Sequence, residues 1–285
     1  MAREISDRIR IAIAQLNPVV GDIAGNVERA RAARDEAAAD NADLVVFTEL
    51  FITGYPPEDL ILKPAFVQAA RDSIEELAAE TGNGSPAMLV GTPWEEDGKV
   101  YNAVALLDGG EVAAVRYKAD LPNYGVFDEK RVFEAGPMPG PVNFGGMRIG
   151  VPICEEIWEE DVCECLAETG AELLIVPNGS PFWSGKMDVR MNVAAARVAE
   201  NAIPLLYANQ VGGQDELVFD GASFVLNADS SLAAQFPAWR EKVAVTEWRK
   251  TNGTWHCVRE KLETVEEGGV ADYMACVTGL RDYVN

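Results

Sequence analysis

Three side chains that can do nucleophilic chemistry stand far apart in the sequence but at equivalent places in the expected elements. Glu49, Lys118 and Cys154 each lie at the carboxyl end of a predicted strand. Because α/β sheets commonly place their active sites beyond these strand ends, the three side chains could meet. A thiol needs a base or a positive neighbour to become a nucleophile, and a carboxylate and an ammonium supply both. The residues therefore permit cysteine catalysis without an imidazole.

The remaining composition argues against catalysis by histidine or by a metal ion. The chain has one histidine, His256, in a weakly patterned region, whereas Ser-His-Asp and Cys-His catalysis both need an imidazole base. One histidine cannot build a histidine zinc site, and the C-x-C spacing of Cys163 and Cys165 does not fit a zinc ribbon. Neither a Walker phosphate-binding loop nor a G-x-G-x-x-G turn is present. We expect no catalytic metal.

Each candidate also has a purely structural interpretation. Cys154 could be a small buried hydrophobic residue, Lys118 a solvated strand end, and Glu49 a cap of a loop. Hydrophobic periodicity does not decide between these interpretations and catalysis.

The elements that must position these side chains alternate between strands and helices. Compact or alternating apolar segments predict strands, and three-to-four-residue periods predict helices. The predicted strands are 10–15, 43–47, 87–91, the hairpin pair 100–107 and 111–118, then 148–153, 171–176 and 204–209. The predicted helices are 26–40 with Asn26 as N-cap, 66–81, 156–169 and 186–199. This alternation predicts an α/β fold with helices covering mixed sheets.

The pattern weakens toward the carboxyl end. A hairpin-like pair is predicted around 220–226, little is predicted beyond Asn227, and 274–283 has the pattern of a helix beginning. A chain of 285 residues accommodates one large α/β domain with a tail.

The net charge of the chain argues against two classes of partner, nucleic acids and anionic membranes. The chain has 24 basic and 46 acidic residues, and its formal net charge of −22 opposes binding to either. No apolar run approaches the roughly 18 residues of a membrane span, and the segment MAREISDRIRIAIAQ does not have the longer apolar stretch and cleavage site typical of a signal peptide. The five irregularly spaced cysteines do not indicate a disulfide framework. We expect a cytoplasmic protein, and the acidity would also suit a salty cytoplasm.

Five segments around the candidate residues follow one another in a fixed order. They are RIAIAQLNPVVGDIAGN, VVFTELFITGYPPEDL, YKADLPNYGVFDEKRVF, IGVPICEEIW and VPNGSPFWSGKMDVR. Together they resemble the carbon-nitrogen hydrolase (nitrilase) superfamily, and within it the glutaminase domains of glutamine-dependent NAD⁺ synthetases. The resemblance spans nearly the whole chain.

The resemblance implies a role for each candidate. Glu49 corresponds to the general base, Lys118 to the oxyanion stabiliser and Cys154 to the nucleophile. Glu129 resembles an additional active-site carboxylate that helps to hold the lysine and the substrate. Tyr124 and three further residues match positions that line the pocket for the amino-acid head of glutamine; the three are Glu155, Ser180 and Lys186. Ser180 also has an interpretation as a simple turn residue.

The resemblance further implies a four-layer α-β-β-α sandwich and a division of the chain. Residues 1–265 correspond to the glutamine amidohydrolase domain, and 266–285 to the start of a linker helix toward a synthetase domain. The SGGxDS motif of that domain is absent, so we expect the natural chain to continue. ATP, Mg²⁺ and deamido-NAD⁺ would belong to the absent domain, and this chain would need no cofactor.

The implied activity is hydrolysis of L-glutamine to glutamate and ammonia through a cysteine thioester, with ammonia passed to the synthetase domain for NAD⁺ synthesis. A homo-oligomer is implied too. Two other functions stay open: a free-standing amidase acting on another ω-amide or carbamoyl compound, and a non-enzymatic docking module that is inactive without its partner domain.

Overall fold

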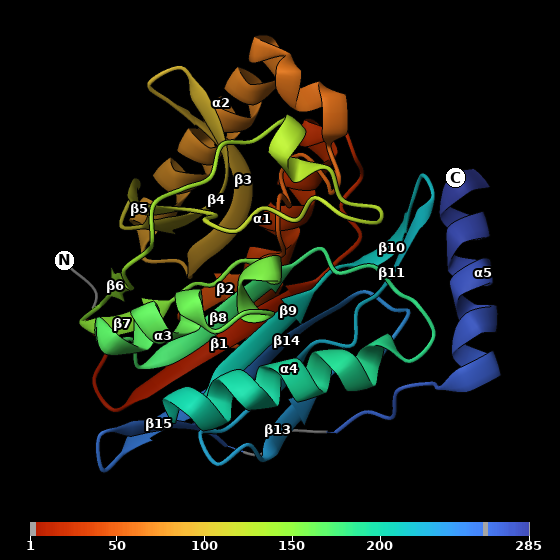
Figure 1. The fold of residues 1–285 in the computed structure, drawn as a ribbon. Helices are drawn as coiled ribbons and strands as arrows, with labels where there is room; N and C mark the ends of the chain where they lie inside the picture. The colour runs from red at the N-terminus through yellow and green to blue at the C-terminus, as the bar shows by residue number, and fades with distance from the viewer. Residues whose placement is uncertain (1–3, 259–261, 285) are drawn as a thin grey trace.

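Two β-sheets pack face to face, and helices cover their outer faces (Figure 1). The structure is a computed structural model that describes residues 4–258 and 262–284. The arrangement is the four-layer α-β-β-α sandwich that the sequence resemblance implied.

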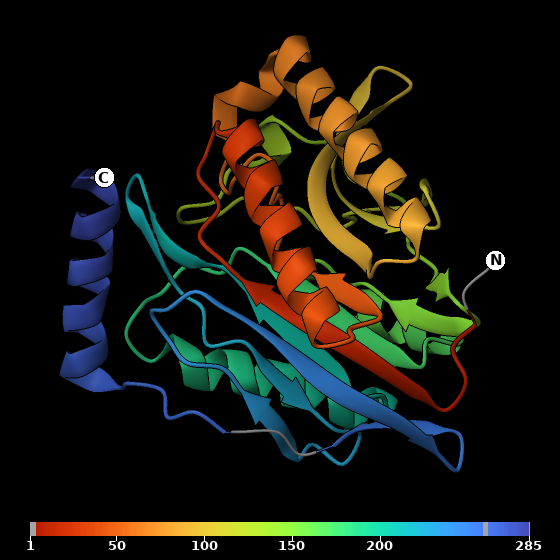
Figure 2. The same cartoon turned by 180° about the vertical axis from the view of Figure 1, so that it is seen from behind.

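The first sheet has seven strands in the order β15-β14-β1-β2-β3-β4-β5. Its strand β1 runs parallel to β2 and antiparallel to β14. Figure 2 shows α1 and α2 lying across the outer face of this sheet. The strands are β1 (Arg8–Gln15), β2 (Leu44–Val46), β3 (Ala87–Glu96), β4 (Lys99–Asp108), β5 (Glu111–Tyr117), β14 (Lys242–Thr251) and β15 (Thr254–Cys257), and the helices are α1 (Ile23–Ala39) and α2 (Pro64–Glu80).

The second sheet has six strands in the order β13-β12-β9-β8-β7-β6. Helices α3 and α4 pack on its outer face through an apolar cluster of their own. The strands are β6 (Val142–Phe144), β7 (Met147–Gly150), β8 (Leu173–Asn178), β9 (Leu205–Asn209), β12 (Phe224–Leu226) and β13 (Leu232–Gln235), and the helices are α3 (Asp161–Glu168) and α4 (Lys186–Asn201). Short 3-10 helices are η1 (Glu58–Leu62), η2 (Thr81–Asn83), η3 (Glu129–Arg131) and η4 (Cys154–Ile157).

Strand β1 explains why the layers stack as they do. Its isoleucines Ile9, Ile11 and Ile13 pack between the two sheets, whereas Ala12 and Ala14 face the helical layer. Successive side chains of a strand point to opposite faces, so both faces of β1 are buried. The small alanines let the helices approach, while the isoleucines fill the space between the sheets.

A two-stranded hairpin extends from the second sheet toward the last helix. Strands β10 (Val211–Gln214) and β11 (Leu217–Asp220) form it, and α5 (Gly268–Val284) packs beside it (Figures 1 and 2). The Asp282 carboxylate fastens α5 by accepting hydrogen bonds from the Gly213 backbone N–H at 2.8 Å and from the Asn17 Nδ2 at 3.0 Å. The last helix is therefore part of the folded domain surface.

Several predicted elements are wrong in detail. Asp22 caps α1, and Asn26 is a buried residue inside the helix, where its side chain bonds to Val19 and Ile52. The expected helix 156–169 is split into η4 and α3. The hairpin expected around 220–226 is instead β10 paired with β11. The last helix begins at Gly268, earlier than 274.

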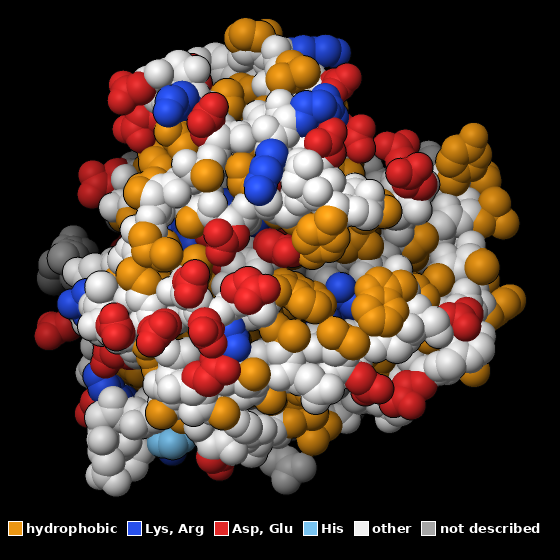
Figure 3. Space-filling model, in the orientation of Figure 1, with side chains coloured by type: hydrophobic (Ala, Val, Ile, Leu, Met, Phe, Trp, Pro, Cys, Tyr) orange, Lys and Arg blue, Asp and Glu red, His pale blue; other side chains and the backbone are white. Residues whose placement is uncertain are grey.

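Acidic side chains are spread over the face shown in Figure 3, in keeping with the net charge of −22. Within the described part of the chain, no helix is both long and apolar enough to cross a bilayer.

Candidate active site

Glu49 lies just beyond β2, in a backbone turn that a glycine on the next strand makes possible. A Cβ atom on Gly91 would lie 2.3 Å from the Thr48 carbonyl oxygen and 2.4 Å from the Leu50 nitrogen. Only glycine therefore allows β3 to approach this turn so closely. The Glu49 side chain is completely buried.

The second sheet also holds Glu49. The Gly179 backbone N–H, just beyond β8, donates to Glu49 Oε2 at 3.0 Å. A Cβ on Gly179 would lie 2.7 Å from the ring of Tyr55, so this contact too requires glycine. Glu49 is thus fixed by backbone from both sheets.

Lys118 directly follows β5 and points into the same buried space. Its Nζ donates to Glu49 Oε1 at 2.6 Å and to Glu129 Oε1 and Oε2 at 2.9 and 3.0 Å. Burial alone would lower the pKa of Lys118, but the Glu129 and Glu49 carboxylates outweigh it and raise the pKa above its usual value. Lys118 is therefore held as an ammonium between two carboxylates.

Glu129, the carboxylate that the family resemblance singled out, completes this cluster. It accepts a hydrogen bond from the Tyr55 hydroxyl at 3.0 Å. Burial raises the pKa of Glu129 to about 7, although Lys118 opposes the shift. Asn102 Nδ2 donates to both carboxylates, to Glu49 at 2.8 Å and to Glu129 at 3.3 Å.

Tyr55 and Asn102 were missed in the sequence. Asn102 had a usable signal, because it is the one polar residue inside an otherwise apolar stretch of β4. In the β4–β5 hairpin Ala103 pairs with Tyr117, which places Asn102 opposite Lys118. Tyr55 lies in the turn after Glu49 and offered no comparable signal.

Cys154 begins η4 in a left-handed backbone conformation, with φ of 47°. Few residues other than glycine adopt this conformation, and it often marks a functional site. The residue is 5% exposed. Burial and then the Glu49 carboxylate raise the pKa of the thiol well above its usual value, with Lys118 opposing them. The resting group is a thiol within electrostatic range of a carboxylate and an ammonium.

Three of the four residues that the resemblance assigned to the substrate's head group, Tyr124, Glu155 and Lys186, lie at the edge of this site. Tyr124 OH lies 2.8 and 2.9 Å from the two Glu155 carboxylate oxygens. Both residues line a surface pocket of about 560 Å³. Lys186 Nζ lies 4.2 Å from the ring centre of Trp158 and 5.3 Å from that of Trp183. Burial and then Arg190 lower the pKa of Lys186, while the Glu155 carboxylate opposes the shift.

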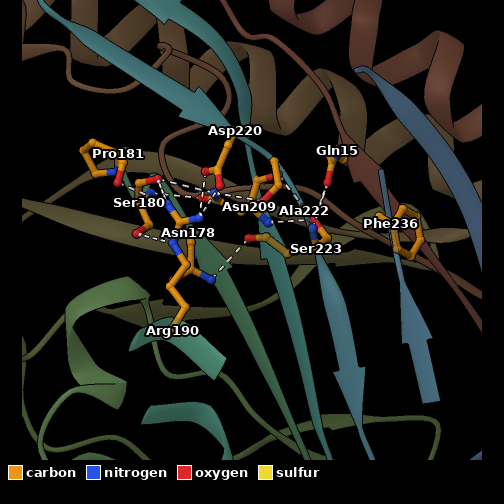
Figure 4. A network of polar contacts seen from close by, with 12 residues as sticks. Gln15, Asn178, Ser180, Pro181, Arg190, Asn209, Asp220, Ala222, Ser223 and Phe236 are labelled. Carbon is orange, nitrogen blue, oxygen red and sulfur yellow. Dashed lines mark hydrogen bonds and ion pairs between the residues drawn. The ribbon is translucent and has the colours of Figure 1, made fainter. Parts of the chain in front are cut away.

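Ser180 belongs to a buried polar network (Figure 4). The residue before it, Gly179, is the one that bonds to Glu49. Arg190 Nε donates to Ser180 Oγ at 3.0 Å, and its Nη2 donates to the Ser180 carbonyl at 2.6 Å. The guanidinium also makes two bonds to Asp220 at 2.7 and 2.8 Å. Asn209 Oδ1 accepts from the Ser180 N–H at 3.0 Å. The Ser180 loop is therefore rigidly held, and neither Arg190 nor Asp220 was singled out in the sequence.

Within residues 4–258 and 262–284, no three His, Cys, Asp or Glu side chains form a group that could hold a metal ion. The reactive groups that the structure brings together are a thiol, an ammonium and two carboxylates.

Comparison with known proteins gives the site a family context. Residues 10–255 match the family model described as carbon-nitrogen hydrolase. A glutamine-dependent NAD(+) synthetase of Rhodobacter capsulatus is 46% identical over 280 residues, which cover 98% of this chain and 50% of that protein.

Solved structures agree with the sequence matches. A glutamine-dependent NAD⁺ synthetase from Acinetobacter baumannii, in complex with ADP, superposes with a TM-score of 0.91 at 33% identity, over 97% of this chain and 52% of that one. A variant of the amidase from Nesterenkonia sp. AN1 has a TM-score of 0.77 at 25% identity, over 87% and 93% of the two chains. It carries the acetamide moiety of fluoroacetamide on its active-site cysteine.

This chain spans about half the length of the curated relatives it matches. The family model nevertheless covers most of its residues, and the fold agrees with both kinds of solved structure. The chain belongs to the carbon-nitrogen hydrolase family.

Proposed function

We propose that the chain hydrolyses the side-chain amide of L-glutamine to glutamate and ammonia through a thioester on Cys154. The observation that carries the proposal is the buried cluster in which Lys118 bonds to Glu49 and Glu129, all within electrostatic range of the Cys154 thiol. Family membership and the identity to glutamine-dependent synthetases support glutamine as the substrate.

The first half-reaction begins with the protonated thiol. Glu49 takes the proton as Cys154 Sγ attacks the carbonyl carbon of the amide, which forms a tetrahedral intermediate. Lys118 and the backbone N–H of Glu155 stabilise its oxyanion. The intermediate collapses as Glu49 returns the proton to the departing nitrogen, so ammonia leaves and a thioester remains.

The second half-reaction uses the same carboxylate. Glu49 deprotonates a water molecule that attacks the thioester, and the second tetrahedral intermediate expels the Cys154 sulfur, which regains its proton from Glu49. Glutamate leaves, and the thiol and carboxylate return to their starting states. This cycle needs no metal or cofactor in this chain.

Charges at the edge of the site suit the two ends of an amino-acid head. Glu155, with Tyr124 bound to its carboxylate, would face the substrate ammonium, and Lys186 would face the substrate carboxylate. Ser180 would contribute from its rigid loop.

The wider role rests on the longer relatives. We propose that the ammonia serves NAD⁺ synthesis from deamido-NAD⁺ in a synthetase portion, which would bind ATP and Mg²⁺. Residues 266–285, which include α5, would lead toward that portion, and a homo-oligomer remains a prediction.

A second candidate function is a free-standing amidase on another ω-amide. The structural match to the Nesterenkonia amidase over nearly the whole of both chains favours it. Measuring release of ammonia from glutamine and from ω-amides that lack the α-amino group separates the two. We expect glutamine to be preferred by about tenfold in kcat/KM, because an amide without the α-amino group forfeits one partly screened charge pair with Glu155. Equal or better use of the simpler amides would favour the amidase.

A non-enzymatic docking module makes a different prediction. It would show no glutamine turnover above a Cys154→Ala control in the isolated chain, with activity appearing only when a synthetase partner is added.

A further inference from the structure

Glu156 is a buried carboxylate that does not belong to the cluster of Glu49, Lys118 and Glu129. It lies two residues after Cys154 and is completely buried. Its Oε2 accepts a hydrogen bond from the Ile153 backbone N–H at 2.6 Å, and its Oε1 accepts one from the Ala119 N–H at 2.5 Å. Ile153 directly precedes Cys154, and Ala119 directly follows Lys118. One carboxylate therefore joins the backbone on which the thiol stands to the backbone on which the ammonium stands.

Arg116 reinforces this connection. The residue is 4% exposed, and its Nη2 lies 2.5 Å from Glu156 Oε2. Its Nη1 also donates to the Tyr117 carbonyl. Arg116 stands on β5 two residues before Lys118, so the ion pair ties η4 to the strand that leads to Lys118.

Local capping of η4 accounts for only half of this arrangement. A glutamate in the first helical turn often accepts a hydrogen bond from the backbone at the start of the helix, as Glu156 does from Ile153. Capping does not require the second oxygen, which reaches a residue 37 positions away in the chain. Nor does it require a buried guanidinium from another strand.

We propose that Glu156 is a positioning residue that sets the separation between Lys118 Nζ and Cys154 Sγ. The inference rests on the proposed function, in which both atoms act on one carbonyl group. A displacement of about 1 Å at a reacting centre can cost about 10²-fold in rate. The two oxygens of Glu156 prevent such a displacement by fixing both backbone segments to one planar group.

Glu156→Gln tests the proposal with little change in shape. The glutamine retains one acceptor oxygen but turns an NH₂ group toward a backbone N–H, so one of the two connections breaks. We expect kcat per folded chain to fall by about 30- to 100-fold while KM stays within about twofold of wild type. The rate at which iodoacetamide alkylates Cys154 should fall as well.

Two further variants separate positioning from stability. The double variant Arg116→Gln/Glu156→Gln removes both buried charges, so neither is left unpaired. It should show the same selective loss of kcat as Glu156→Gln. Glu80→Gln is the matched control, because it removes a carboxylate that pairs with Arg31 and Arg34 between α1 and α2. It should lower stability without changing kcat per folded chain.

The outcomes are distinct for the two proposals. Glu156 has no positioning role if Glu156→Gln or the double variant retains kcat within about threefold of wild type. The same conclusion follows if these variants lose total activity only in proportion to their loss of folded chain, as expected for Glu80→Gln. If wild type itself does not hydrolyse glutamine, the proposed substrate fails, while the alkylation rates still test the positioning of Cys154.

Discussion

The buried cluster and the edge of the site are built in opposite ways. Glu49, Lys118 and Glu129 are almost wholly removed from solvent, and Lys118 bonds to the two carboxylates at 2.6 to 3.0 Å. Tyr124, in contrast, is 56% exposed, and its partner Glu155 is only partly buried. Groups from both sheets and from η3 hold the first region, whereas the second is open to solvent.

This difference in burial indicates that the two regions serve different steps, catalysis and substrate recognition. Charges in a water-poor interior interact strongly and cannot reorganise, which suits stabilisation of a developing oxyanion. Charges at a partly exposed surface are screened, so each contributes modestly and mainly to recognition. Changes in the cluster should therefore lower kcat, and changes at the edge should raise KM.

Removal of the nucleophile should have the largest effect. Cys154→Ala leaves the charge cluster intact, and we expect kcat to fall by about 10⁴-fold or more because no covalent route remains. Glutamate production in a coupled assay measures this, with the thermal unfolding curve as a control for the fold. Turnover by Cys154→Ala within about 100-fold of wild type would contradict a covalent mechanism.

Removal of the Lys118 ammonium should have the second-largest effect on kcat. Lys118→Met keeps the length of the side chain but leaves two buried carboxylates without a cation between them, and we expect kcat to fall by about 10²- to 10³-fold. The free energy of unfolding should also fall by about 3 to 5 kcal/mol, since breaking a buried ion pair strands its partners. Urea denaturation and steady-state kinetics measure the two effects. An unchanged stability would mean that the cluster is not the tightly coupled unit described above.

The protonation of Glu129 should make the activity of the protein depend on pH. Because burial raises the pKa of Glu129 to about 7, acidification through pH 7 protonates it and removes a negative charge that balances Lys118. Activity of wild type should therefore fall as pH falls through this range, with an apparent pKa that belongs to the coupled cluster. Glu129→Gln should lower kcat by about 10- to 100-fold and shift this acidic limb to lower pH.

The profile of kcat/KM between about pH 5.5 and 9 measures this limb. Identical limbs in wild type and Glu129→Gln would assign the titration to another group.

Changes at the edge should be smallest. Lys186→Met should raise KM for glutamine about tenfold with kcat within about threefold, because it removes one partly screened charge pair with the substrate. Tyr124→Phe removes only the hydroxyl bonded to Glu155, and should raise KM about two- to fivefold. A large loss of kcat in either variant would erase the distinction between cluster and edge.

Glu49 and Lys118 were easier to single out in the sequence than the residues around them, and the reason is physical. Glu49 and Lys118 were found because they end strands with clear apolar patterns. Their shared burial was not predictable from periodicity alone, because it depends on how two sheets meet. Asn102 was missed although it is the one polar residue in an apolar stretch of β4, and Arg190 was missed because its partner Asp220 lies 30 positions away in the chain.

Errors in the elements have the same cause. Asn26 has the residue type of an N-cap, but tertiary bonds to Val19 and Ile52 place it inside α1. Strand β14 was missed because charged residues such as Lys242, Glu247 and Arg249 obscure its alternation, yet it pairs along the whole of β1. A local sequence pattern predicts an element poorly where contacts with residues distant in the chain determine the structure.

The most direct test of the central claim is covalent labelling by a diazoketone analogue of glutamine, followed by peptide mapping of the labelled chain by mass spectrometry. We expect one adduct per chain, on Cys154, formed more slowly when glutamine is present. An adduct confined to Cys163, Cys165, Cys257 or Cys276, or no adduct on a folded chain, would contradict a Cys154 nucleophile.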